Sequence, residues 1–281
     1  MFENIIGNKK IKDILEKSIE NNQVTHSYLM IGMQGIGKKL IAKEFAKEIL
    51  GRDIINNPDF IYIEPEADMI KIEKIRQLQK EIQEKPIISK KKVYLIDNAD
   101  LMNKEAQNCF LKTLEEPPEF AVIILIGSNE NSFLPTIKSR CMILHYKELN
   151  DEEIREYLQK EFNEQNISQN LIDIAGGSIG RAIKLKNKQD EYLKIEEIIN
   201  NIAKRDLIDI VQESETLYKS KDDINDILEY INIILLKMAK TNYLYTNCIS
   251  IVEDTKKRLI QNANYDMCID NMLFKMWEEI N

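Results

Sequence analysis

The fold is decided by residues 28–39, which read YLMIGMQGIGKK. The first four are apolar and form a short run typical of a buried strand. A turn follows that contains three glycines, Gly32, Gly35 and Gly37. Residues 40–50 then show the apolar spacing of a helix. A glycine-rich turn between a strand and a helix suits phosphate, because its backbone N–H groups and the helix N-terminus favour anions. The stretch therefore predicts a P-loop in an α/β domain, with Lys38 placed to reach phosphates.

Outward from this loop, apolar runs alternate with helical patterns as far as residue 148. Further strands are expected at 59–63, 93–97, 121–127 and 142–145, and further helices at 8–22, 72–82 and 103–116. Such alternation indicates a mostly parallel sheet covered on both faces. Ligands of these sheets bind at the carboxyl ends of the strands. The P-loop glycines, Asp97 and Ser128 fall at such ends, so we expect them to form one nucleotide site.

Beyond residue 148 the sequence has helical periodicity only. Short helical segments in residues 149–188 are interrupted at Gly176-Gly177-Ser178. Residues 189–281 contain five longer helical patterns, at about 191–203, 207–218, 224–240, 249–263 and 267–279. The broad apolar stripe of residues 224–238 is typical of a bundle core. We predict an α/β P-loop domain at 1–148, a small helical lid at 149–188 and an all-α C-terminal bundle at 189–281.

Composition narrows the classes of function. The 281 residues carry a formal charge of −8, which argues against tight DNA binding by this chain alone. The four cysteines are scattered and form no C-x-x-C pair, so no metal site is predicted. Single cysteines, the absence of a signal peptide and the absence of a long apolar run predict a cytoplasmic protein with no membrane partner.

Two positions depart from an active nucleotide site. The residue after the P-loop lysine is usually Ser or Thr, whose hydroxyl binds Mg²⁺. Here it is Lys39, whose ammonium group repels a cation. Asp97 resembles the metal-binding aspartate of P-loop ATPases, but it is followed by Asn98, and an amide is no base at neutral pH. The site is predicted to be degenerate: weak ATP binding stays open, and hydrolysis is not expected.

A second candidate site lies in residues 134–141, which read LPTIKSRC. Pro135 suits the first position of a short helical turn before the strand at 142–145. Arg140 keeps its charge at any ordinary pH and presents a planar fork of donors to phosphate. On these residues alone a surface salt bridge is the simpler interpretation. The rest of the chain favours a phosphate held by a neighbouring subunit.

Together these segments resemble the clamp-loader subunits of bacterial DNA polymerase III, which are AAA+ proteins. The similar segments, in chain order, are Ile5-Ile6-Gly7, His26-Ser27-Tyr28-Leu29, the P-loop, residues 111–118 (LKTLEEPP), Ser139-Arg140-Cys141 and Gly180-Arg181. Their order and spacing carry the resemblance over about residues 1–188. Within the family, Lys39 and Asn98 agree with the δ′ type and disagree with the motor type, where both positions are intact.

The resemblance implies a division of labour in DNA replication. Motor subunits bind and hydrolyse ATP, and a δ′-type subunit is a stator that donates the Ser-Arg-Cys arginine in trans to its neighbour's ATP. That arginine would be Arg140, between Ser139 and Cys141. Arg181 would be the second sensor, expected here only to hold the lid to the sheet. The implied partners are motor (τ/γ-type) and δ subunits, the sliding clamp and primer-template DNA.

Three functions stay open at this point. The chain is an assembly subunit that donates Arg140, a motor ATPase with an unusual metal site, or a nucleotide-binding switch without hydrolysis. Lys39 and Asn98 argue against the motor. Some relatives carry a cysteine zinc module after the P-loop helix, but residues 51–60 contain no cysteine, so no zinc is predicted. DNA polymerase (nucleotidyltransferase) activity is expected only of a holoenzyme, because no polymerase site is recognisable.

Overall fold

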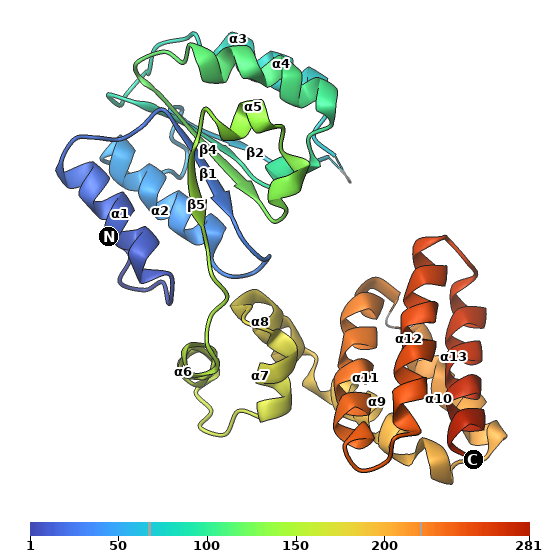
Figure 1. The fold of residues 1–281 in the computed structure, drawn as a ribbon. Coiled ribbons are helices and arrows are strands. Elements are labelled where there is room, and N and C mark those ends of the chain that lie inside the picture. The colour runs from blue at the N-terminus through green and yellow to red at the C-terminus, as the bar shows by residue number, and fades with distance from the viewer. Residues whose placement is uncertain (67–68, 220) are drawn as a thin grey trace. The chain divides into compact units, whose positions relative to one another are not determined.

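The computed structural model describes residues 1–66, 69–219 and 221–281. Its helices and strands (Figure 1) are α1 (Lys9–Glu20), β1 (Ser27–Ile31), α2 (Lys38–Leu50), β2 (Phe60–Ile63), α3 (Ile72–Glu81), β3 (Lys92–Ile96), α4 (Lys104–Glu115), β4 (Ala121–Gly127), α5 (Pro135–Lys138), β5 (Met142–His145), α6 (Asp151–Phe162), α7 (Gln169–Ala175), α8 (Ile179–Asn187), α9 (Gln189–Asn201), α10 (Leu207–Tyr218), α11 (Ile224–Ala239), α12 (Tyr245–Ile260) and α13 (Tyr265–Ile280). Short 3₁₀ helices η1 (Ala99–Leu101), η2 (Glu130–Ser132), η3 (Ile202–Lys204) and η4 (Lys221–Asp223) lie between them.

The chain divides into two compact units. The first contains Met1–Asn166 and Gly176–Arg181, and the second contains Ile167–Ala175 and Ala182–Asn281. The residues predicted to form a separate lid, 149–188, are thus shared between the two units. The division into three domains at 148 and 188 stays a prediction.

The first unit is built on a five-stranded sheet in the order β2-β3-β4-β1-β5. Every pair of neighbouring strands is parallel, as predicted. β1 lies between β4 and β5, with Ser27 opposite Ile123 and Tyr28 opposite Met142. The P-loop therefore leaves the sheet from an inner strand.

Helices cover both faces of this sheet. Alternate side chains of β1 enter different cores: Leu29 packs with α3 and α4, whereas Tyr28 and Met30 pack with α1 and α2. Figure 1 shows these two helix pairs on opposite sides of the strands. Both cores consist of aliphatic and aromatic side chains, as expected when a parallel sheet is buried on two faces.

Local sequence signals fix where several helices end. Gly51 follows α2 in the left-handed region, at φ 65°, which costs a glycine little. The Asn103 side chain accepts a hydrogen bond from the N–H of Ala106 and begins α4. Asn150 and Glu153 form a reciprocal capping box at the start of α6.

The second unit is a helical bundle, as predicted. One core joins Ile174 of α7 and Leu185 of α8 to side chains of α9, α11, α12 and α13. α11 contributes most of its length, with Ile227, Leu228 and Ile231 fully buried. No helix in the described ranges is both long and apolar enough to cross a membrane.

Candidate functional site

The carboxyl edge of the sheet gathers the predicted nucleotide-site residues. β1, β3 and β4 are neighbours, so the residues that follow them meet at this edge. The P-loop follows β1, Asp97 follows β3 and Ser128 follows β4. Gly37 closes the loop with φ 90° directly before α2, and no side chain would fit at Gly32, where a Cβ would lie 2.8 Å from the carbonyl oxygen of Tyr146.

Lys38 is folded back onto its own loop. Its Nζ donates to the carbonyl oxygen of Met33 at 2.7 Å and to that of Gly32. The side chain is almost fully buried. Burial lowers the pKa of this ammonium group to about 8, although the charges of Asp100 and Asp97 oppose the shift. The amine that would meet phosphate is therefore occupied by backbone carbonyls.

Lys39 contacts the aspartate that follows β3. Its Nζ is 3.0 Å from Oδ2 of Asp97 and 4.7 Å from the centre of the Tyr62 ring. The Tyr62 hydroxyl donates to the same carboxylate oxygen at 2.9 Å. Burial lowers the pKa of Lys39, but the bonds to Tyr62 and Asp97 more than offset this and raise it. Lys39 thus forms an ion pair with Asp97, the residue that resembles the metal-binding aspartate of P-loop ATPases.

The segment after α7 closes over the P-loop. The hydroxyl of Ser178 donates to the carbonyl oxygen of Gln34 at 2.9 Å, and the N–H of Gly180 donates to that of Gly35 at 2.9 Å. The two glycines approach so closely that a Cβ on Gly180 would lie 2.9 Å from Cα of Gly35. Arg181 follows directly, and its backbone N–H donates to the Ser178 hydroxyl at 3.1 Å.

Asp100 organises the end of β4. Its Oδ2 accepts hydrogen bonds from the backbone N–H groups of Ser128 and Asn129, at 2.9 and 3.1 Å. Asn98 has φ 47°, which asparagine tolerates better than most residues, and its N–H donates to Oδ1 of Asp97. In this arrangement the polar groups at the carboxyl edge bind one another.

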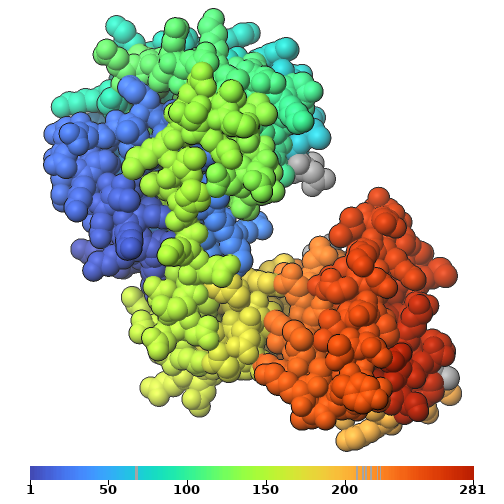
Figure 2. All heavy atoms as spheres, in the orientation of Figure 1, coloured from blue at the N-terminus to red at the C-terminus, as the bar shows by residue number. Residues whose placement is uncertain are grey.

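Arg140 lies at the end of the sheet opposite to the P-loop. It precedes β5 and is therefore at the amino ends of the strands, away from the P-loop. Its Nη2 donates to Oε1 of Glu115 at 2.6 Å, and its Nη1 donates to the Thr136 carbonyl at 2.9 Å and to the Ser139 hydroxyl at 3.3 Å. About a third of the side chain is exposed. Atoms around residues 130–145, yellow-green in Figure 2, form part of the outer surface of this unit.

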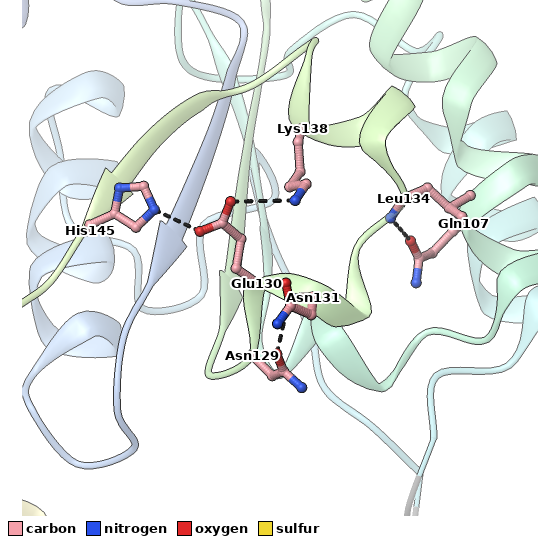
Figure 3. A network of polar contacts seen from close by, with 7 residues as sticks. All are labelled: Gln107, Asn129, Glu130, Asn131, Leu134, Lys138 and His145. Atoms are coloured by element: carbon pink, nitrogen blue, oxygen red, sulfur yellow. Dashed lines mark hydrogen bonds and ion pairs between the residues drawn. The ribbon is translucent and has the colours of Figure 1, made fainter.

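A polar network holds the segment that carries Arg140. Figure 3 shows Glu130 between Lys138 of α5 and His145 of β5, at 3.4 and 2.8 Å. The bonds from His145 and Lys138 keep the pKa of Glu130 below its usual value. The Gln107 side chain of α4 accepts from the N–H of Leu134 at 2.8 Å. α5 is thus tied to α4, β5 and the turn after β4.

The two neighbours of Arg140 differ in what they can do. The Ser139 hydroxyl donates to the Thr136 carbonyl at 3.1 Å, so it supports the end of α5. Burial raises the pKa of the Cys141 thiol to about 12. Burial thus disfavours the thiolate, which is the form in which a cysteine acts as a nucleophile.

Sequence reasoning missed three partners of these sites: Tyr62, Asp100 and Glu115. Tyr62 lies on a strand, and nothing in its spacing points to Asp97. Asp100 follows Asp97 closely, so a second carboxylate after a strand was a usable signal. Glu115 belongs to the family-like LKTLEEPP segment, but its contact with Arg140 depends on the packing of α4 beside α5. No group of three metal-binding side chains occurs among the residues that the structure describes.

Comparison with solved structures gives the same fold. A gamma-subunit-related protein of DNA polymerase III from Thermotoga maritima aligns with 97% of this chain and 99% of its own, with a TM-score of 0.59 at 17% identity. The RuvB protein of the same organism aligns with 68% of this chain and 64% of its own, with a TM-score of 0.52 at 17% identity. The sheet, the helices on its two faces and the helical region that follows define a protein with the AAA+ fold.

Residues 7–150, just over half of the chain, match the family described as DNA polymerase III, delta subunit. The chain belongs to this family. It is 24% identical to DNA polymerase III subunit delta' of Bacillus subtilis, over 96% of each chain. It is 31% identical over 72% of its length to subunit tau/gamma of Haemophilus influenzae, of which it spans 32%. The predicted family is therefore confirmed.

Proposed function

We propose that this chain is a δ′-type stator of a clamp loader, which donates Arg140 in trans to the ATP site of a neighbouring motor subunit. Its proposed partners are motor (τ/γ-type) and δ subunits, the sliding clamp and primer-template DNA. In this role the chain itself hydrolyses nothing. An arginine supplied to a neighbour's transferring phosphate can change turnover by orders of magnitude.

The observation that carries the proposal is the ion pair of Lys39 with Asp97. A hydrolysing site needs a divalent cation at this carboxylate, and the pair places a fixed ammonium group there instead. Lys38 is also bound by its own loop. Arg140 lies at the other edge of the sheet and on the surface, where it serves no ATP of its own chain.

Replacing Arg140 tests the proposal. Arg140→Ala is expected to leave assembly of a reconstituted loader intact and to lower its DNA-dependent ATPase at least about tenfold, because one transition-state cation is lost. The measurement is ATP turnover by the assembled complex, with assembly checked by gel filtration. Arg52→Ala, which removes an exposed arginine beside the end of α2, is the matched control. Unchanged turnover in the Arg140 variant would contradict the proposal.

A motor-type or nucleotide-switch subunit is the second candidate. It is favoured by the higher identity to tau/gamma, 31%, than to delta', 24%, and by the preserved P-loop glycines. Titration of the isolated chain with a fluorescent ATP analogue separates the candidates. No binding at millimolar nucleotide supports the stator, binding indifferent to Mg²⁺ supports the switch, and micromolar binding strengthened by Mg²⁺ supports the motor.

A further inference from the structure

The Arg140 guanidinium is already engaged within its own chain. Nη1 contacts two acceptors of the α5 turn, the Thr136 carbonyl and the Ser139 hydroxyl. Nη2 contacts Glu115, at the last position of α4, at 2.6 Å. A charge-assisted bond of this length is a close ion pair. A phosphate from a neighbour must therefore compete with, or share, the donors of this side chain.

We propose that Glu115 is a positioning residue that holds Arg140 and competes with the neighbour's phosphate for it. A phosphate bound to the same guanidinium would lie within a few ångströms of the Glu115 carboxylate, and two anions at that separation repel each other. The inference rests on the proposed function of Arg140. It adds that Arg140 binds the neighbour's phosphate in competition with a carboxylate of its own chain.

The exposure of the pair sets the size of the effect. The side chains are 33% and 48% exposed, for Arg140 and Glu115, so water and salt screen their attraction. Pairs of this kind shift an equilibrium by a few-fold at most, about 2- to 5-fold. Glu115 therefore tunes the availability of Arg140 and does not block it.

The neighbouring glutamate provides a matched control. Glu115 and Glu116 are both exposed, adjacent and of equal charge, but only Glu115 contacts Arg140. Glu115→Gln and Glu116→Gln remove one charge each and keep the side-chain shape. A difference between them therefore reports the contact and not the net charge of the surface.

The test is the DNA-dependent ATPase of a reconstituted loader that contains the full chain. Glu115→Gln is expected to raise kcat about 2- to 5-fold at low salt, whereas Glu116→Gln leaves it unchanged. The gain is expected to shrink as salt rises from about 50 to about 300 mM. In an Arg140→Ala background Glu115→Gln is expected to have no effect on kcat, because the guanidinium that Glu115 binds is then absent.

Three results would overturn the inference. They are a fall in kcat on Glu115→Gln, no change while Arg140→Ala still lowers turnover, and a rise that persists in the Arg140→Ala background. If Arg140→Ala itself leaves turnover unchanged, the proposed function fails as well. Glu115→Gln thus tests the role of Glu115, and Arg140→Ala tests that of Arg140.

Discussion

In the first unit, the ammonium group of Lys39 is paired with the carboxylate of Asp97 at the end of β3. Lys39 after the P-loop lysine was enough to indicate that a cation would be repelled. Its pairing with Asp97 and its contact with the Tyr62 ring depend on the order of the strands, which brings together residues that are far apart in the chain. Polar partners of this kind carry no periodic signal, so they could not be predicted.

Lys38 gives a pH-dependent prediction at the same scale. Burial lowers the pKa of its ammonium group to about 8, against about 10.4 for an ordinary lysine. Between these values the unfolded chain binds more protons than the folded chain, so the free energy of unfolding should rise with pH. Relative to Lys38→Met, we expect a rise of about 1–3 kcal/mol from pH 8 to pH 10, measured by urea unfolding.

The control for this experiment is Lys10→Met, at an exposed position of α1. This variant is expected to keep the wild-type pH profile. Parallel profiles for wild type and Lys38→Met would contradict the prediction.

Among the elements, the strands and helices of the first unit followed from apolar periodicity, because a strand that is buried on both faces leaves an uninterrupted apolar run. The ends of the helices were harder to predict. The helix expected at 249–263 is Tyr245–Ile260 instead. A turn in which Asn242 accepts from the N–H of Leu244 allows an earlier start, and Asn262 at φ 59° follows its end. Such turns depend on single side chains and not on periodicity.

Asp59, directly before β2, shows how one side chain fixes an element. It is fully buried and accepts the N–H groups of Ile87, Ile88 and Ser89 at 2.6, 2.8 and 2.6 Å. These bonds hold the loop that leads into β3. Burial alone would raise the pKa of Asp59, but the three N–H groups lower it below the usual value.

Asp59→Asn is expected to lower the free energy of unfolding by about 1–3 kcal/mol at pH 7, because it removes a charged acceptor of three bonds. A depressed carboxyl pKa stabilises the fold above the ordinary value and loses this effect as pH falls through the folded value. The difference between wild type and variant should therefore shrink below about pH 4 in urea titrations. Asp53→Asn, at an exposed position that accepts one N–H, should have little effect. Equal losses in both variants would count against the prediction.

For the whole molecule, the sequence separated an α/β part from a helical part near residue 148, because the alternation of strands stops there. It could not show that the following helices are shared between two units. Whether α7 and α8 pack with the sheet or with the bundle depends on complementary surfaces, and short amphipathic helices suit either. The strand order could not be predicted for the same reason, since an apolar run does not indicate which strand lies beside it.

The residues that build the core of the second unit predict which of two fragments has the higher free energy of unfolding. Ile174 of α7 and Leu185 of α8 belong to the core of the bundle. A fragment of residues 189–281 lacks both, so its free energy of unfolding should be lower by about 2–5 kcal/mol than that of residues 167–281. Chemical unfolding followed by circular dichroism measures this. Equal stability would show that the bundle core is complete from residue 189 onward.

The close approach of Gly35 and Gly180 has a consequence for the history of this chain. Neither position has room for a side chain, and the groups that fill the space belong to the protein itself. Purifying selection on packing would therefore preserve the glycine signature in a lineage that had given up hydrolysis. A census of ATPases based on P-loop glycines would then count such a lineage together with the active enzymes.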